Sequence, residues 1–440
     1  MRPALLAATA LLTLAPAAAQ DDLAGAVAED YERHLGALFE HLHANPELSF
    51  REFETAKRLA RELEAAGFTV TTGIGQTGVV AVMENGEGPT VMVRADMDGL
   101  PVKEDTELPY ESRATQEDVD GVTKPVMHAC GHDVHVTSLV GTARQLSARK
   151  DDWSGTLVLI GQPAEEKISG ARAMIQDGLY RDFPKPDFAL AFHVSAQAPT
   201  DTITVPKAAA YSSSDSVDIT VRGVGAHGAY PHMGLDPVLV ASQIVVSLQS
   251  VVSRTLSPLD PGVITVGSIH GGSKHNIIPD EVTLQLTVRS DDPDVRAQLL
   301  DGIDRVAEGV ARAHGTPDDL LPIVKRSETQ TTPPTVNDTA LATRIEGVFA
   351  DHFGDSVLRD EPRTGMGAED FAYFVERDLG VRGLYFAVGG TPPEDVATAP
   401  SHHSPFFKVA PEPSVTLGTE AMVVAVMELM KPGGAGAAGE

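Results

Sequence analysis

The sequence predicts an α/β fold, in which a mostly parallel sheet is flanked by helices and carries an inserted ferredoxin-like (βαββαβ) unit. Outside the insertion, apolar segments of strand length alternate with segments of helical periodicity. These strand segments are apolar on both faces, as expected for buried parallel strands with helices on each side. From about residue 208 the pattern changes to alternating strands in the order β-α-β-β-α-β. The length of 440 residues suffices for two or three domains.

The larger domain is predicted from two separate parts of the chain. Residues 23–67 carry helical spacing, with a break at Asn45-Pro46 and an end at Gly67. The other helices predicted for this domain span residues 132–147, 341–353, 371–374 and 415–430. Its predicted strands span residues 69–72, 79–83, 90–94, 156–160, 188–194 and 384–388.

The inserted unit is predicted over residues 208–328. Its strands are expected at residues 216–221, 263–269, 282–289 and 321–324, and its helices at residues 237–253 and 295–313. Pro333-Pro334 marks the return to the larger domain, which therefore comprises residues 21–207 and 329–431. We expect the Gly/Ala-rich residues 432–440 to be a disordered tail.

The composition excludes several classes of function. Sixty-two Asp and Glu against 34 Lys and Arg give a formal net charge of −28. Such an acidic protein is a poor ligand for phosphates or anionic lipid, so we expect no nucleic-acid or membrane partner. The single cysteine excludes an intramolecular disulfide. Beyond the first 20 residues, we find no uninterrupted apolar stretch of the roughly 18 residues needed to span a bilayer.

Residues 1–20 are predicted to be a signal peptide. Arg2 precedes a short apolar run, and an Ala-x-Ala-like site ends at Ala19. The alternative is an N-terminal core helix, but the segment lacks the amphipathic pattern of such a helix. We therefore expect an exported protein, either periplasmic or secreted.

Side chains that bind metals occur in four separated segments: Cys130 and His132, Glu165 and Glu166, His193, and His402 and His403. Gly131 allows the backbone to turn between the first two residues. Because ligands in open α/β sheets bind beyond the carboxyl ends of strands, we expect the four segments to meet in one cleft. Mixed N, O and S ligands suit zinc, manganese, cobalt or nickel better than calcium or magnesium.

Each segment alone has a more ordinary explanation. A lone cysteine is most often a small buried apolar side chain, and adjacent glutamates usually lie on a solvated surface. The joint placement of the segments at strand ends favours a metal site. A thiolate ligand would also explain why an exported protein keeps one unpaired cysteine.

The adjacent glutamates suggest hydrolysis of an amide. Their side chains point in different directions, so one carboxylate can ligate a metal while its neighbour holds a water. That neighbour can take a proton from the water, promote attack on a carbonyl and pass the proton to the leaving amine. The sequence contains no Gly-x-Ser-x-Gly elbow and no Walker motif, which argues against serine hydrolysis and phosphate binding.

Other polar residues have less specific surroundings. Asp96 and Asp98 follow a predicted strand, and we expect them to orient ligating histidines, with simple loop capping as the alternative. In the inserted unit, two glycine-rich loops carry His227 and Asn276. Flexible turns with incidental polar residues are the alternative interpretation of these loops.

The motifs occur together in one order: His128-Ala129-Cys130-Gly131-His132-Asp133, Gln162-Pro163-Ala164-Glu165-Glu166, Gly225-Ala226-His227, Asn276-Ile277-Ile278-Pro279 and His403-Ser404-Pro405. Over residues 30–430, approximately, the chain resembles the metal-dependent amidohydrolases grouped with aminoacylases and glutamate-releasing carboxypeptidases. It is most similar to the branch of hippurate hydrolases, N-acyl-amino-acid amidohydrolases and indole-acetyl-amino-acid hydrolases. The resemblance implies that the inserted unit is a lid and dimerisation domain.

The resemblance also implies roles for individual residues. Two divalent ions (Zn, Mn, Co or Ni) would be bound by Cys130, His132, Glu166, His193 and His403. Glu165 would be the general base and acid, and His227 would stabilise the oxyanion, often in the partner subunit's site. Asn276 would contact substrate, and Arg289 would pair with a substrate carboxylate. The chain departs from related proteins at Cys130, where peptidases have a bridging carboxylate, and at Gly228 after the lid histidine.

We therefore expect an exported metal-dependent amidohydrolase that forms a homodimer or a higher homo-oligomer. Its expected substrates are N-acyl or aromatic-acyl amino acids, cleaved to a carboxylate and a free amino acid. A dipeptidase or carboxypeptidase, and a non-catalytic binding protein that retains the fold, are the alternatives.

Overall fold

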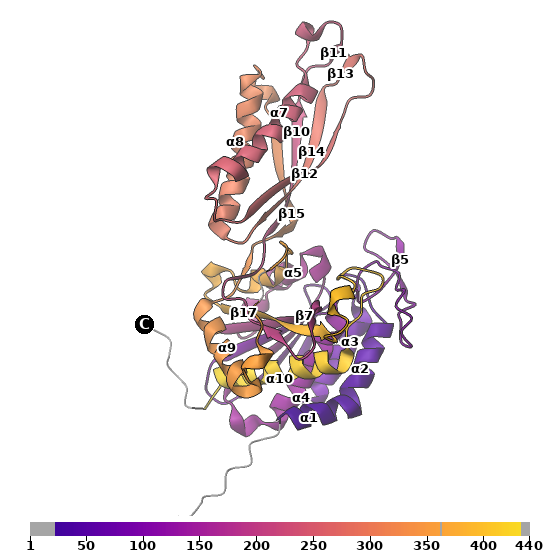
Figure 1. Cartoon of the computed structure of the whole chain (residues 1–440), viewed down its shortest axis with the longest axis vertical. Coiled ribbons are helices and arrows are strands. Elements are labelled where there is room, and N and C mark those ends of the chain that lie inside the picture. Colours follow the sequence, from indigo (N-terminus) through magenta and orange to yellow (C-terminus); the bar gives the residue numbers. More distant parts are fainter. Residues whose placement is uncertain (1–22, 361–362, 433–440) are drawn as a thin grey trace, which may run out of the picture.

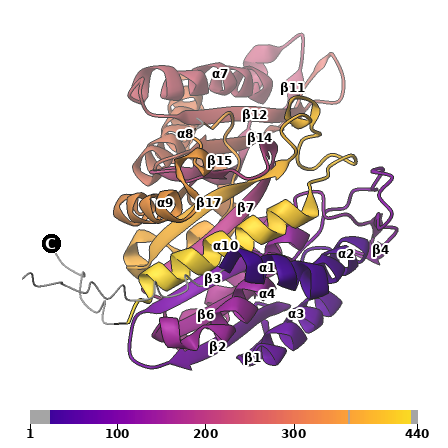
Figure 2. The same cartoon turned by 60° about the horizontal axis from the view of Figure 1, so that its bottom comes forward.

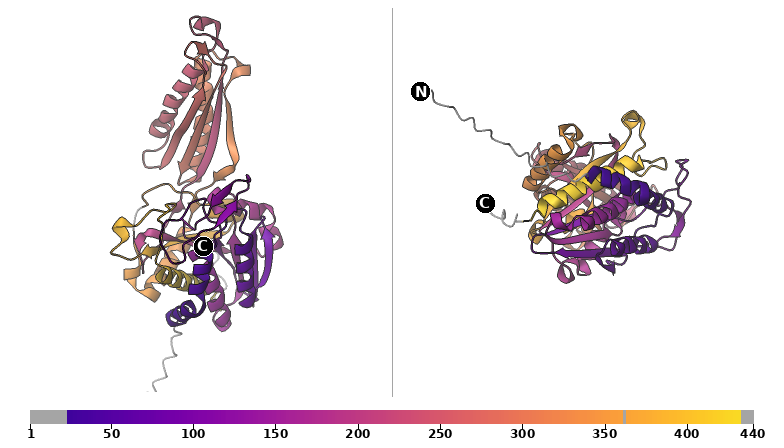
Figure 3. Two further views of the ribbon diagram at one scale, coloured as in Figure 1. Left: turned by 90° about the vertical axis from the view of Figure 1, so that its right-hand side faces the viewer. Right: turned by 90° about the horizontal axis from the view of Figure 1, so that it is seen from below.

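The computed structural model describes residues 23–360 and 363–432 and contains two principal sheets (Figure 1). The predicted signal peptide and residues 433–440 of the predicted tail lie outside the described residues. One sheet has seven strands in the order β1-β2-β6-β3-β7-β17-β8, and the other has four in the order β12-β14-β10-β15. Figures 1 and 3 show the smaller sheet standing above the body that contains the larger one.

The larger sheet is parallel at its centre. Its central strands β6, β3, β7 and β17 run parallel to one another, whereas β2 pairs antiparallel with β6, β1 with β2, and β8 with β17. The sequence did not predict β8, because two residues carry no recognisable period. The strands are β1 (Thr69–Ile74), β2 (Gly78–Asn85), β3 (Thr90–Asp96), β6 (Gly155–Gln162), β7 (Phe188–Pro199), β8 (Ile203–Thr204) and β17 (Arg382–Thr391).

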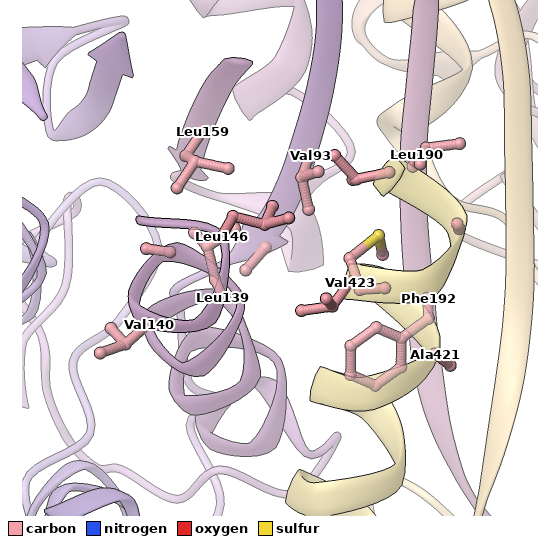
Figure 4. Packing of buried hydrophobic residues seen from close by; sticks show 14 of the residues in the cluster. Val93, Leu139, Val140, Leu146, Leu159, Leu190, Phe192, Ala421 and Val423 are labelled. Carbon is pink, nitrogen blue, oxygen red and sulfur yellow. The ribbon is translucent and has the colours of Figure 1, made fainter. Parts of the chain in front are cut away.

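Helices cover both faces of this sheet, because successive side chains of a buried strand point to opposite sides. On one face, Val93, Leu190 and Phe192 of the sheet pack against helices α4 and α10 (Figures 2 and 4). Short helices, α5 (Gly170–Gln176) and α6 (Leu179–Asp182), cover the other face. The helices of the first face are α1 (Leu23–Asp30), α2 (Gly36–Ala44), α3 (Phe53–Ala65), α4 (His132–Ala148), α9 (Thr339–Phe353) and α10 (Pro411–Leu429).

The four-stranded sheet is antiparallel and has its own apolar core with helices α7 and α8. Asp236 and Asp292 cap these two helices through backbone N–H groups, and each is followed by proline at the first helical position. The elements of this unit are β10 (Ser214–Arg222), α7 (Pro237–Ser250), β12 (Gly262–Gly271), β14 (Glu281–Ser290), α8 (Pro293–Ala313) and β15 (Ile323–Thr332).

Two expectations for local structure need correction. The strand predicted at residues 321–324 is β15, which continues to Thr332; its outer residues are mostly exposed and polar because it lies at the sheet edge. The helix predicted at residues 371–374 is a 3-10 turn, η8 (Asp370–Phe374). The chain leaves and re-enters the larger body through a short pair that the sequence did not predict, β9 (Ala209–Tyr211) with β16 (Thr335–Val336).

Helix α7 meets a test for membrane-spanning helices although polar residues interrupt its apolar run. With the turn that continues it, α7 forms a 19-residue helix, Pro237–Thr255, whose mean hydropathy of 1.3 meets that test by length and composition alone. Its inner face packs against the four-stranded sheet. Its outer face exposes Val238, Leu239 and Val246.

Candidate metal centre

The five predicted metal ligands converge beyond the carboxyl ends of the parallel strands. The Sγ atom of Cys130 lies 3.5 Å from Nε2 of His193. Ligand atoms of Cys130, His132 and Glu166 all lie within 4.8 Å of one another. His403 joins the group through its Nε2 atom, which is 3.4 Å from Oε1 of Glu166. Residues separated by up to 273 positions in the sequence (130 to 403) therefore share one site.

The turn before α4 directs two of these ligands into the site. Gly131 has a φ of +89°, and a Cβ atom there would lie 2.3 Å from Cγ1 of Val194, so the position requires glycine. Nδ1 of His132 donates to the backbone oxygen of Asp98 at 2.8 Å. This bond fixes the ring so that Nε2 faces Glu166 and the other ligands.

The glutamate pair lies in a strained turn, η3 (Glu165–Lys167), with left-handed residues on both sides: Ala164 (φ +49°) and Ile168 (φ +52°). The carboxylate of Asp98 accepts the backbone N–H groups of Glu165 and Glu166, each at 3.1 Å. Asp98 therefore holds the glutamate turn with its side chain and orients His132 through its backbone oxygen; the sequence predicted the orienting role but not which atom of Asp98 serves it.

Asp96 also has partners that differ from the prediction. Its Oδ1 accepts from Nδ1 of His135 at 2.6 Å, and its Oδ2 accepts from Arg94 at 2.7 Å. Nε2 of His135 accepts the backbone N–H of Val194, so both ring nitrogens of His135 are engaged. Oδ2 of Asp96 lies 3.5 Å from Nε2 of His132, close to the site but without a hydrogen bond that orients this ligand.

His402 contacts the site although the resemblance assigned the ligand role to its neighbour. Its Nδ1 lies 3.7 Å from Sγ of Cys130, and its Nε2 accepts the backbone N–H of Ala196 at 3.2 Å. A neutral imidazole that accepts at Nε2 carries its proton on Nδ1. Ligand atoms of His402, Cys130 and His193 also lie within 4.8 Å of one another. In this tautomer, however, His402 donates to the Cys130 sulfur, so His403 remains the ligand candidate that the resemblance implies.

This arrangement predicts different losses for the two histidines. We expect His403→Ala to retain about one of the two ions, and His402→Ala to bind both ions with affinity lowered about 10- to 100-fold. Metal analysis after dialysis against buffers of defined free zinc would measure both effects. A full ion complement in His403→Ala together with a lost ion in His402→Ala would reverse the assignment.

A cluster of buried acidic residues lies next to Glu165. Arg94 donates to Glu369 at 2.6 Å, and the Tyr385 hydroxyl donates to the same carboxylate at 2.7 Å. Carboxylate oxygens of Glu165, Glu369 and Asp370 lie within 4.8 Å of one another. Burial and these neighbouring carboxylates raise the pKa of Glu165 well above its ordinary value. No pattern in the sequence indicated this cluster, because Glu369 and Asp370 follow no strand.

The chemistry of the site fits divalent cations. Nε2 of His132 and Oε1 of Glu166 are buried and have no hydrogen-bond partner in the described structure. Burial and the Glu166, Glu165 and Asp96 carboxylates raise the pKa of the Cys130 thiol well above its usual range. Burial and the Asp98 and Asp96 carboxylates also raise the pKa of Glu166 to about 7, although His132 lowers it. Cations would satisfy the free acceptor atoms and neutralise the surplus of acids.

Four of the candidate ligands, Cys130, Glu166, His193 and His403, line a cavity of about 860 Å³. Arg289 of β14, for which a substrate-binding role is predicted, also lines it. His227 and Asn276 are not among its lining residues. They lie together around the short strands β11 (Ala226–His227) and β13 (Ile277–Ile278), where the Gly228 N–H donates to the Asn276 oxygen at 2.8 Å. Figure 1 shows this pair at the end of the inserted unit farthest from the larger sheet, so within one chain neither residue reaches the site.

Comparison with known proteins agrees with this geometry. Residues 92–428 match the family model described as peptidase family M20/M25/M40. The chain is 37% identical over 336 residues to the hippurate hydrolase of Campylobacter jejuni subsp. jejuni, covering 76% of this chain and 83% of that protein. It is 36% identical over 347 residues to the N-acetyl-L-cysteine deacetylase of Bacillus subtilis, covering 78% of each.

A solved structure extends the similarity to three dimensions. The Bacillus subtilis YXEP protein, described as a dinuclear metal binding peptidase from the M20 family, matches with a TM-score of 0.74 at 27% sequence identity. The match covers 91% of this chain and 99% of that one. Fold, converging ligands and sequence similarity over most of the chain agree, and the protein belongs to peptidase family M20/M25/M40.

Proposed function

We propose that this protein hydrolyses the amide bond of N-acyl amino acids, aromatic-acyl ones among them, by a metal-dependent mechanism with Glu165 as general base and acid. The observation that carries the proposal is the position of Glu165. Its carboxylate borders the cavity beside the converging ligands, while the adjacent Glu166 faces Cys130 and His132. The two relatives named for hippurate and for an N-acetylated amino acid support the substrate class.

Different residues of the chain have different roles in this reaction. Divalent cations, when bound by Cys130, His132, Glu166, His193 and His403, supply the Lewis acidity that brings the pKa of water towards neutrality. Glu165 takes a proton from the attacking water and returns it to the leaving nitrogen as the C–N bond breaks. The Asp98 carboxylate accepts the backbone N–H of Glu165 and so keeps Glu165 in place. Arg289 pairs with the α-carboxylate of the amino-acid half.

A substrate panel tests this function. The enzyme, loaded separately with Zn, Mn, Co and Ni, would be assayed on N-acetyl amino acids, hippurate, dipeptides with a free α-amine, and N-methylbenzamide. We expect chelator-sensitive hydrolysis of the N-acyl amino acids and none of N-methylbenzamide, which lacks the carboxylate for Arg289. Faster cleavage of the dipeptides than of their acetylated forms would identify a dipeptidase instead. No chelator-sensitive turnover of any substrate would favour a binding protein.

We also propose that two copies of the chain assemble through the inserted unit. Helix α7 exposes Val238, Leu239 and Val246, and β12 is an edge strand of the four-stranded sheet. A second copy packed on this face would cover apolar side chains and pair the free strand edge. It would also offer His227, which is remote from the site of its own chain, to the partner's cavity.

Mixing inactive variants tests this assembly. If His227 acts across the interface, Glu165→Gln and His227→Ala are each inactive, but one of the two sites in a mixed dimer carries both native residues. Equal mixing should then restore about a quarter of wild-type activity, because half of the dimers are mixed and each has one native site. Pairing Glu165→Gln with the double variant is the matched control and should restore nothing. Confirmed exchange without recovery would place the action of His227 within its own chain.

For localisation, we propose that the chain is exported and that its signal peptide is removed by cleavage after Ala19 or Gln20. The apolar run and small-residue site of the N-terminus support this proposal. Mass spectrometry of the protein from its native host should find a mature N-terminus at Gln20 or Asp21. An intact Met1 on the accumulated protein would contradict export by this route.

A further inference from the structure

One polar group of the cavity has no part in the chemistry described above. Tyr211, the last residue of β9, lines the cavity together with Cys130, Glu165 and His193. No described residue makes a hydrogen bond with its hydroxyl group. A phenol has an ordinary pKa of about 10, so at neutral pH the hydroxyl keeps its proton and is available as a donor.

The backbone and ring of Tyr211 are held in place by the chain. Its backbone lies opposite Thr335 in the β9–β16 pair, and the next residue donates its N–H to the Gly367 oxygen at 2.8 Å. The ring meets the Tyr385 ring edge-on, with 5.1 Å between centroids and 76° between planes. It also passes close to Gly367, where a Cβ atom would lie 3.7 Å from Cδ1. The hydroxyl is thus positioned before any substrate binds.

The Glu369 carboxylate near this ring is already engaged by other donors. The Tyr385 hydroxyl donates to Oε2 of Glu369, and Arg94 and the Phe371 N–H donate to Oε1 of the same carboxylate. The ring centroid of Tyr211 lies 6.4 Å from that of His193, one of the proposed metal ligands. Tyr211 therefore lines the same cavity as the ligand cluster and Glu165, which is where the reacting carbonyl must lie.

We propose that the Tyr211 hydroxyl donates a hydrogen bond to the oxygen of the scissile carbonyl and stabilises the negative charge that develops there. The proposal rests on the proposed function, because it concerns the same amide. Ionised carboxylates and a thiolate cannot donate such a bond, whereas a neutral phenol can. A hydrogen bond from a fixed donor to this oxygen becomes stronger as negative charge develops on the oxygen. The bond therefore stabilises the transition state more than the bound substrate.

Tyr211→Phe removes the hydroxyl and retains the ring. We expect kcat for the best N-acyl amino acid to fall about 10²-fold, with KM changed less than about threefold. Metal content and Tm should remain those of the wild type. The matched control is Tyr180→Phe, which removes a hydroxyl that donates to the Phe374 backbone oxygen, and Tyr180 does not line the cavity. This control should leave kcat unchanged.

Binding measurements separate this role from simple substrate binding. In Tyr211→Phe, calorimetry should show that a phosphinate analogue of the tetrahedral state loses affinity by about the same factor as kcat/KM, while the planar carboxylate product binds as before. Equal affinity for the phosphinate, kcat within twofold of wild type, or a rise in KM alone would each overturn the proposal. If the wild type cleaves no N-acyl amino acid, the proposed function fails, and the two binding affinities still decide whether Tyr211 recognises a tetrahedral oxygen.

Discussion

Glu165→Gln is expected to lower kcat by about 10³- to 10⁴-fold, near the upper limit for loss of a general base. The substitution retains the size of the side chain and its place in the η3 turn, because the turn is held by backbone N–H bonds to Asp98. The amide cannot accept the proton of the attacking water or return it to the leaving nitrogen. Steady-state kinetics on the best substrate of the panel would measure the loss.

Two controls keep this result interpretable. Metal analysis of Glu165→Gln should find the wild-type ion content, because the carboxylate that groups with both Cys130 and His132 is that of Glu166, whereas Glu165 groups with Glu369 and Asp370. Glu54→Gln changes an exposed carboxylate of α3, paired with Lys57, and should leave turnover unchanged. If Glu165→Gln kept its ions and more than a tenth of the wild-type turnover, another group would have to be the base.

Removal of the divalent ions is expected to lower turnover by about 10³-fold or more, since Lewis-acid stabilisation contributes several kcal/mol to such reactions. It should also lower the stability of the fold. Cys130, Glu165 and Asp96 are buried and Glu166 is partly buried beside them, so without cations their charges or orphaned atoms are uncompensated. At a free ion concentration of 100 times Kd, ion binding would contribute about 2.7 kcal/mol to the free energy of unfolding.

Activity and Tm would be followed during dialysis against a chelator and again after Zn, Mn, Co or Ni is restored. Both quantities should fall together and recover with at least one of the ions. Cys130→Ser provides the matched variant, because it retains the shape of the side chain and removes the thiolate. It should bind ions more weakly and recover less activity at the same metal concentration. Unchanged activity and Tm after complete removal of metal would refute a metal-dependent mechanism.

Local patterns carried much of the prediction. The strands β2, β3, β6 and β7 were found because each is a run of apolar residues with strand length, which reports burial on both faces. The helices of the inserted unit were found for the equivalent reason, an apolar stripe at helical spacing. The short strands β9 and β16 were not predicted, because two or three residues are too few to show an alternation of apolar and polar side chains. The exposed end of β15 was not predicted, because an edge strand need not be apolar.

The sequence by itself determined the α/β class, the order of the elements and the five metal-ligand candidates, because hydrophobic period, turn residues and ligand motifs are properties of neighbouring positions. Only the tertiary structure decided which other groups surround them. Arg94 and Glu369 meet across 275 positions, and Tyr211 reaches the cavity from the connection between the two sheets. The same packing places His227 far from the site of its own chain. Such contacts form only when separate elements pack together. The pattern of neighbouring residues in the sequence therefore does not predict them.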